Sequence, residues 1–204
     1  MNRRLDRLAA VAVSALLVAA SVGCAGGPPR DDGRAGDGVV QAADTGRVRP
    51  GAVAVYPQGQ RQPAPTLSGE LLDGTAFDGA TLDGMVVVVN FWASWCAPCR
   101  AEADDLDAAY AATRDQGVRF LGINIRDGRD QARAFVEGRE SYPSLFDPAG
   151  KVALGFTDVS PNTIPSTVII DRQRRVAVVL RKAITERELT PAIQQVAREP
   201  DGSR

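Results

Sequence analysis

The sequence contains no histidine, and this absence removes several kinds of site at once. Catalysis by a cysteine–histidine or serine–histidine pair needs an imidazole as its general base. Zinc and copper centres of the histidine-containing types are excluded for the same reason. The net charge of −1, without a basic patch interleaved with aromatic residues, gives no basis for nucleic-acid binding.

Cysteine is scarce as well, with three residues in a chain of 204. Two of them, Cys96 and Cys99, form a C-x-x-C within "FWASWCAPCRAE", and the third is Cys24 near the N-terminus. A structural zinc site needs four ligands, and the sequence offers neither a second C-x-x-C nor a histidine, so no metal is expected. A bridge between cysteines three positions apart closes a tiny loop and adds little stability. The spacing therefore favours a redox centre over a zinc site or a purely structural disulfide.

The N-terminal segment has the composition of a secretory signal. Arginines among the first seven residues precede an apolar run from Leu8 to Gly23, which is shorter than the roughly 20 residues that a membrane-spanning helix needs. We therefore predict a signal over residues 1–24. Its end, Ser21 to Cys24, resembles the lipobox of bacterial lipoproteins, which implies that Cys24 carries a lipid and tethers the chain to the outer side of the cell membrane. Cleavage at a nearby small residue, giving a secreted chain, is the alternative.

A stretch rich in glycine, proline, aspartate and arginine follows the signal. Few of its residues could bury apolar area, so residues 25–62 are predicted to form a flexible linker. Within it, the more apolar segment 52–56 could add an edge strand, and the sequence does not decide this. Residues 63–201 carry the patterns of one folded domain of ordinary size.

Strand-like and helix-like segments alternate through residues 63–201. The turn dipeptide Asp73–Gly74 in "LSGELLDGTAF" predicts a β-hairpin. Buried strands are predicted at "MVVVVNFWA", "VRFLGINI", "STVIID" and "RRVAVVLR", the last two antiparallel. Helices are predicted after the cysteines, at "GRDQARAFVEGRE" and near the C-terminus, where Thr185 and Glu188 suggest a capping box and Pro191 an alternative start. This order predicts a three-layer α/β sandwich. Because no G-x-G-x-x-G or Walker loop is present, no nucleotide cofactor is expected.

The strand that ends before Cys96, and the helix that begins there, indicate which thiol reacts. The free N–H groups and the dipole at a helix N-terminus favour a thiolate at Cys96. Pro98 fits the first helical turn, where a missing N–H costs nothing. Cys99 lies one turn further along, where it would be shielded and able to attack a mixed disulfide at Cys96. We therefore predict Cys96 as the nucleophile and Cys99 as the resolving thiol.

The segment "FWASWCAPCRAE" resembles the active-site segment of thioredoxin-like proteins, and its context is most similar to the membrane-tethered TlpA/ResA type. The resemblance runs from "APTLSGELLDG" to the last predicted helix. It implies a thioredoxin-like three-layer sandwich with a mixed central sheet and an N-terminal β-hairpin extension, and an enzyme that cycles through a Cys96–Cys99 disulfide. It also implies that Pro165 is cis and faces the sulfurs, while the backbone of Ile164 pairs with the partner's extended chain.

The resemblance assigns roles to further residues around the dithiol. Asn90 stands where thioredoxin itself has a buried acid, and Glu102 matches a glutamate near the dithiol of the TlpA/ResA type. A carboxylate there, with its pKa raised by burial, could accept the proton of Cys99. The alternative for Glu102 is a solvated glutamate favoured by the helix dipole. Trp92 is predicted to fill the core, and the remaining partner-facing residues are predicted to be Trp95, Ala97 and Pro98.

The resemblance to the TlpA/ResA type further implies a reductive role outside the cytoplasm. Electrons would come from a thiol-shuttling membrane reductant and pass to oxidised protein thiols, with apocytochrome c before haem attachment as the candidate target. Ala97–Pro98 between the thiols differs from the Pro-His pair of strong oxidants and favours a reductant.

Other activities on the same fold are alternatives to a reductant. An extracytoplasmic thiol oxidant would differ in its reduction potential. A thiol peroxidase would carry P-x-x-x-[TS]-x-x-C, whose proline is missing at the required spacing before Ala93 or Ser94. The absence of histidine counts against a copper chaperone. A binding module without redox activity would be unaffected by loss of Cys96.

Overall fold

The computed structural model describes residues 39–41, 51–139, 142–157 and 163–200. Its strands are β1 (Val39–Gln41), β2 (Val53–Val55), β3 (Gly69–Glu70), β4 (Ala76–Phe77), β5 (Val86–Trp92), β6 (Val118–Ile125), β7 (Ser144–Asp147), β8 (Ser166–Ile170) and β9 (Val176–Leu180). Its α-helices are α1 (Ala97–Thr113), α2 (Arg129–Val136), α3 (Lys151–Leu154) and α4 (Glu186–Ala197).

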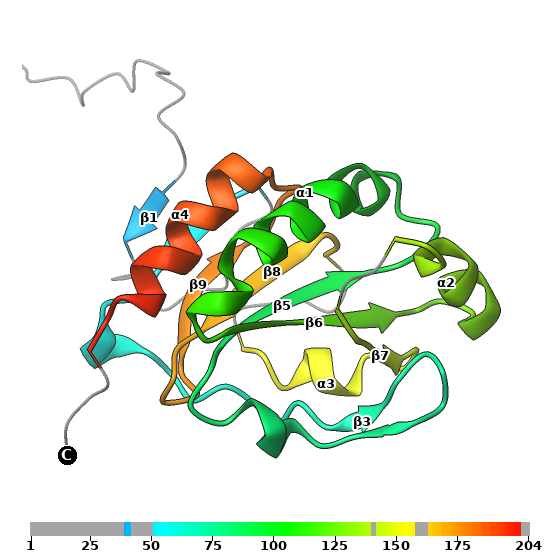
Figure 1. The fold of residues 1–204 in the computed structure, drawn as a ribbon, viewed down its shortest axis with the longest axis horizontal. Coiled ribbons are helices and arrows are strands. Elements are labelled where there is room, and N and C mark those ends of the chain that lie inside the picture. The colour runs from blue at the N-terminus through cyan, green and yellow to red at the C-terminus, as the bar shows by residue number, and fades with distance from the viewer. Residues whose placement is uncertain (1–38, 42–50, 140–141, 158–162, 201–204) are drawn as a thin grey trace, which may run out of the picture. The chain divides into compact units, whose positions relative to one another are not determined.

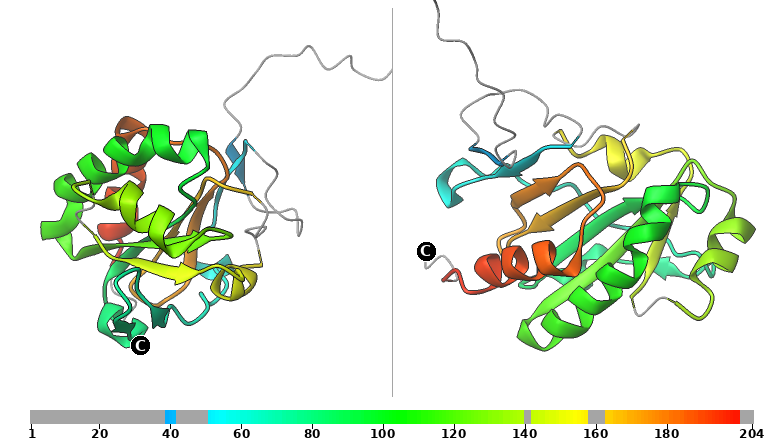
Figure 2. Two further views of the ribbon diagram at one scale, coloured as in Figure 1. Left: turned by 90° about the vertical axis from the view of Figure 1, so that its right-hand side faces the viewer. Right: turned by 90° about the horizontal axis from the view of Figure 1, so that it is seen from above.

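The strands form one mixed sheet of seven, in the order β1-β2-β9-β8-β5-β6-β7, and a separate hairpin of β3 and β4. The central strand β5 runs parallel to β6 and antiparallel to β8. Helices α1 and α4 cover one face of the sheet, and α3 and the hairpin lie on the other (Figures 1 and 2). The predicted three-layer sandwich with a mixed sheet and an N-terminal hairpin is confirmed.

Alternation along β5 divides the core between the two faces of the sheet. Val86 and Val88 pack with the residues of α1 and α4, whereas Val87, Val89 and Phe91 pack toward α3 and the segment before β5. Every residue of β5 is buried. The unbroken apolar run in the sequence therefore reflects a strand that is covered on both sides.

The helices and short strands settle one prediction about local structure and include two elements that were not predicted. The capping box of Thr185 and Glu188 starts α4, so the alternative start at Pro191 is wrong and Pro191 lies inside the helix. Strand β7 and helix α3 were not predicted. Each has four residues, too few for a hydrophobic period to be recognised.

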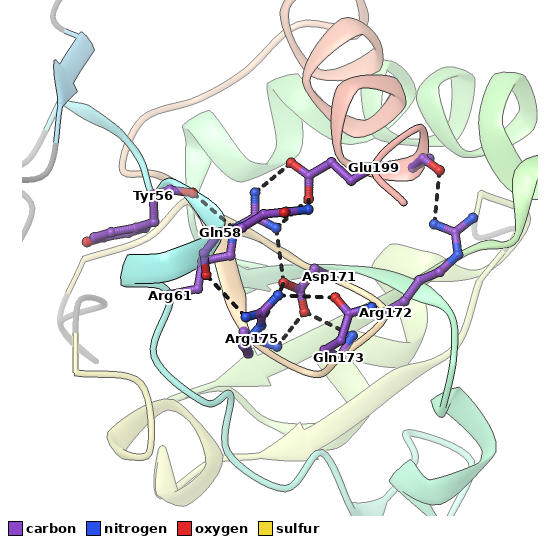
Figure 3. A network of polar contacts seen from close by, with 9 residues as sticks. Tyr56, Gln58, Arg61, Asp171, Arg172, Gln173, Arg175 and Glu199 are labelled. Carbon is purple, nitrogen blue, oxygen red and sulfur yellow. Dashed lines mark hydrogen bonds and ion pairs between the residues drawn. The ribbon is translucent and has the colours of Figure 1, made fainter. Parts of the chain in front are cut away.

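The predicted linker boundary is wrong for residues 51–62. Strand β2 pairs antiparallel with β9 and extends the sheet. Six residues after this strand, Arg61 is buried, and its Nη1 lies 3.0 Å from Asp171 Oδ2 and 2.5 Å from Glu199 Oε2. Figure 3 shows Arg61 between these two carboxylates, one on the β8–β9 turn and one after α4. The folded domain therefore begins before residue 63, because distant partners hold a locally polar segment. Residues 25–38 and 42–50 lie outside the described residues, as does the predicted signal with Cys24.

We expect Gly122→Ala to lower the free energy of unfolding by about 1–3 kcal/mol through overpacking. On β6, a Cβ at Gly122 would lie 1.9 Å from Ser144 Oγ and 2.9 Å from Trp92 Nε1. These two atoms form a buried hydrogen bond of 3.2 Å, which fixes the indole that the sequence placed in the core. Urea unfolding measures the change. Gly59→Ala is the control, because nothing lies within 4 Å of a Cβ there. Equal stability of the two variants would show that the side chains of Ser144 and Trp92 move aside at no cost.

Candidate redox-active site

The two cysteines lie where β5 passes into α1, and they form a disulfide. The Cys96–Cys99 bond has an S–S length of 2.01 Å and a Cα–Cα distance of 5.3 Å. Cys96 is the N-cap of α1, and Cys99 lies in its first turn with Pro98 beside it. The local sequence explains this arrangement, because a β-branched run ends at Trp92 and good helix formers begin at Ala97.

The helix N-terminus provides a hydrogen bond to the first sulfur. The backbone N–H of Cys99 donates to Cys96 Sγ at 3.2 Å. Both cysteines are buried, whereas Trp95, Ala97 and Pro98 beside them are exposed. An N–H donor and the helix dipole both favour negative charge on Cys96 when the disulfide opens. The arrangement can therefore favour a reactive thiolate at Cys96 and keep a second thiol, Cys99, within bonding distance of it.

The loop before β8 contains a cis-proline and packs against the hydrophobic cluster of the two cysteines. The Ile164–Pro165 peptide bond is cis, in agreement with the resemblance. Pro165 is buried, and Ile164 is half-buried against the hydrophobic cluster that contains both cysteines. The fold thus packs Ile164 against the cluster of the two cysteines, although it lies about 65 positions further along the sequence than Cys99.

Glu102 is the buried carboxylate of the site, and the solvated alternative is wrong. Its side chain lies on the buried face of α1 and is 2% exposed. Glu102 Oε1 accepts from Asn90 Nδ2 at 2.9 Å, and Oε2 accepts from the backbone N–H of Ile184 at 3.0 Å. Burial raises the pKa of Glu102 to about 7, although the two hydrogen bonds oppose the shift. A carboxyl group with this pKa can exchange a proton near neutral pH. Because Glu102 follows Cys99 by three positions on one helix, both occupy the same helix face.

Sequence reasoning did not single out Asp127, which lies beside the active-site turn. Its carboxylate accepts hydrogen bonds from Ser94, two positions before Cys96, and from Asn124 at the end of β6. A usable signal was present, because the carboxyl ends of neighbouring parallel strands meet at one edge of a sheet. Polar residues that follow β5 and β6 are therefore expected to be neighbours.

The described part of the chain shows neither a metal-binding cluster nor a membrane-spanning helix. Within those ranges, no group of three or more cysteine, aspartate or glutamate side chains is arranged to hold a metal ion. The helices of the same ranges include none with the length and apolar character needed to span a bilayer.

The fold and the disulfide at the head of α1 define a thioredoxin-like protein of the thiol-disulfide oxidoreductase class. Residues 60–179 match the AhpC/TSA family, and the chain belongs to that family. It is similar to the thiol:disulfide interchange protein HelX of Rhodobacter capsulatus, with 32% identity over 71% of this chain and 79% of the relative. The thiol-disulfide oxidoreductase ResA of Bacillus subtilis is 29% identical over 60% of this chain and 68% of its own length.

A solved structure with the same fold comes from Corynebacterium glutamicum and is described as a secreted thiol-disulfide isomerase. The two chains superpose with a TM-score of 0.68 at 34% identity, covering 72% of this chain and 92% of the other. The predicted similarity to ResA-type proteins and the predicted class of enzyme are confirmed.

Proposed function

We propose that this thiol-disulfide oxidoreductase reduces protein disulfides on the outer side of the cell membrane. The observation that carries the proposal is the Cys96–Cys99 disulfide at the N-terminus of α1. The similarity to proteins named HelX and ResA supports this proposal. The small Ala97–Pro98 pair between the thiols is consistent with a reductant.

Reduction begins with the dithiol form of the protein. The Cys96 thiolate, favoured by the helix N-terminus, attacks one sulfur of the substrate disulfide. A mixed disulfide forms between Cys96 and the substrate, and the other substrate sulfur leaves as a thiolate that takes a proton from water. The exposed side chains of Trp95, Ala97 and Pro98 and the backbone of Ile164 receive the partner's chain around this sulfur, and Pro165 shapes the surface.

Release requires the second thiol to become a nucleophile. The Glu102 carboxylate accepts the proton of the Cys99 thiol, and the resulting thiolate attacks Cys96 Sγ. The Cys96–Cys99 disulfide forms, and the second substrate sulfur departs as a thiolate. Two electrons have then passed from the protein to the substrate. A membrane protein that shuttles thiols restores the dithiol.

The composition of the N-terminal residues supports a location outside the cytoplasm. Residues 1–24 act as a secretory signal, and a lipid on Cys24 holds the domain at the outer surface of the membrane. Disulfides accumulate in that compartment, so a dedicated reductant is needed wherever a free thiol pair is required. Haem attachment to a C-x-x-C-H segment is such a requirement. Oxidised apocytochrome c is therefore the proposed substrate.

Cys99→Ser is expected to trap the substrate on the enzyme. Without the resolving thiol, the mixed disulfide at Cys96 persists. Cells producing full-length Cys99→Ser are treated with acid to stop exchange, and the complexes are separated without reductant and identified by mass spectrometry. We expect apocytochrome c among the captured proteins.

A Cys96→Ser/Cys99→Ser variant is the matched control and should capture nothing. The direction of electron flow is tested separately by equilibrating the full-length protein with glutathione buffers. A reduction potential nearer to about −270 mV than to about −120 mV is expected, since these values are typical of a reducing and of a strongly oxidising dithiol. Capture of many unrelated secreted proteins together with a high potential would favour the oxidant instead.

A further inference from the structure

The carboxylate of Asp127 joins two loops that meet beside the disulfide. Asp127 Oδ2 accepts from the backbone N–H of Ser94 at 2.5 Å, and Oδ1 accepts from the Ser94 hydroxyl at 2.9 Å. Asn124 Nδ2 donates to Oδ2 at 3.0 Å, and the N–H of Gly128 donates to Oδ1 at 2.9 Å. One side chain therefore fixes the turn that precedes Cys96 against the loop between β6 and α2.

The next residue of the turn, Trp95, is held by the same loop. Its indole Nε1 donates to the carbonyl oxygen of Arg126 at 2.9 Å. Arg126 has a φ of 52°, in the left-handed region that non-glycine residues seldom adopt. The guanidinium of Arg126 lies 5.6 Å from the centre of the Trp95 ring. Because Arg126 directly precedes Asp127, the position of the indole depends on the conformation that the Asp127 carboxylate stabilises.

Trp95 is held in place while much of its surface stays open to solvent. It is 57% exposed, although a large apolar side chain is normally buried. Beside it lies an open groove of about 390 Å³, whose walls include Trp95, Arg126, Asp127 and Gln131. An exposed aromatic ring that is already ordered loses little conformational entropy when another chain packs on it. This arrangement suits a docking platform next to the nucleophile.

We propose that Asp127 is a positioning residue, which holds Trp95 as a platform for the polypeptide that flanks the substrate disulfide. The proposal rests on the function proposed above and specifies how a protein substrate is distinguished from a small disulfide. A small disulfide has no flanking chain and reacts at Cys96 without using the platform. Asparagine in place of Asp127 has one acceptor oxygen instead of two, so it cannot accept all four hydrogen bonds.

Asp127→Asn tests the proposal in the full-length, reduced protein. The substrates are an oxidised peptide containing Cys-x-x-Cys-His and hydroxyethyl disulfide, each reduced in a single turnover. We expect the peptide-to-small-disulfide ratio of rate constants to fall about tenfold through a higher half-saturating peptide concentration, because charge-assisted hydrogen bonds are lost from the platform. Ser94→Ala removes one hydrogen bond and should cause a smaller fall. The double variant should resemble Asp127→Asn, since the Ser94 hydroxyl acts through its hydrogen bond to the Asp127 carboxylate, which the first substitution already weakens.

A second measurement follows the platform itself. In a Trp92→Phe background Trp95 is the only tryptophan, and acrylamide quenching of its fluorescence should increase when Asp127→Asn is added. Asp130→Asn, an exposed aspartate on α2, makes the same charge change and should alter neither readout. Equal slowing of both substrates, or unchanged quenching, would overturn the proposal and leave Asp127 as a structural clamp. Failure of the wild type to reduce either substrate would instead overturn the proposed function and this inference with it.

Discussion

Glu102→Gln is expected to slow disulfide exchange by roughly 100-fold near pH 7, as for the loss of a general base. The wild-type rate of substrate release should rise as the pH passes through about 7, where the Glu102 carboxyl group loses its proton. In the variant this step should disappear, and the rate should rise only at the higher pH at which a thiol ionises unaided. Stopped-flow measurement of the release step over a range of pH gives both results.

The same substitution is expected to stabilise the fold above neutral pH. Between the ordinary pKa of 4.5 and the folded value of about 7, the folded state retains a proton that the unfolded chain has lost. The free energy of unfolding therefore falls as the pH rises through this window. A glutamine cannot ionise, and the shift from 4.5 to about 7 is worth roughly 3 kcal/mol at pH 8. The loss of one of the two hydrogen bonds that Glu102 accepts offsets about 1 kcal/mol, so the variant should be more stable than the wild type by about 1–3 kcal/mol.

Slower exchange together with higher stability distinguishes a functional carboxyl group from a structural one. A glutamate that served only the fold would make the variant less stable and leave the pH dependence of exchange in place. Glu137→Gln, an exposed glutamate after α2, is the matched control and should change neither property. An unchanged exchange rate in Glu102→Gln would refute the proposed role.

The chemistry of the site could be predicted because it is local in sequence. A buried strand, a C-x-x-C and a helix start follow one another within a few residues, and each has its own pattern. Glu102 also had a local signal. The buried positions of α1 are Cys99, Glu102, Leu106, Ala109 and Thr113, a spacing of three and four residues that defines one helix face. A glutamate on that face is expected to be buried with a shifted pKa.

The parts that sequence reasoning missed depend on contacts between distant segments. Arg61 resembles a linker residue because its neighbours are glycine, glutamine and proline, and its partners lie 110 and 138 positions away. Asp127 resembles an ordinary loop residue until the turn at Ser94 is placed beside it. Hydrophobic periods predict where elements form, but they do not predict which polar side chains will meet between elements.

Asp171→Ala is expected to lower the free energy of unfolding by about 3–5 kcal/mol, because it takes one of two carboxylate partners from the buried Arg61 and leaves several hydrogen-bond donors of the β8–β9 turn without their acceptor. Asp171 is 2% exposed and accepts from Arg61 Nη1 at 3.0 Å and from Arg175 Nε at 3.1 Å. It also accepts from the backbone N–H groups of Gln173 and Arg175, which shape the β8–β9 turn. The substitution therefore affects both the turn and the docking of the segment before β3. Urea unfolding at pH 7 measures the loss.

Asp83→Ala is the matched control, because Asp83 also pairs with an arginine of the β8–β9 turn. Its 2.8 Å contact with Arg174 is solvent-exposed, so the loss should be below about 1 kcal/mol and should shrink further in high salt. The buried network should respond to acid instead. The hydrogen bond from Arg61 lowers the pKa of Glu199 below 4.5. The ionised Glu199 therefore contributes to stability above pH 4.5, and this contribution is lost as the pH falls through the lowered pKa of Glu199. If Asp171→Ala were no more destabilising than Asp83→Ala, residues 51–62 would be held by strand pairing alone.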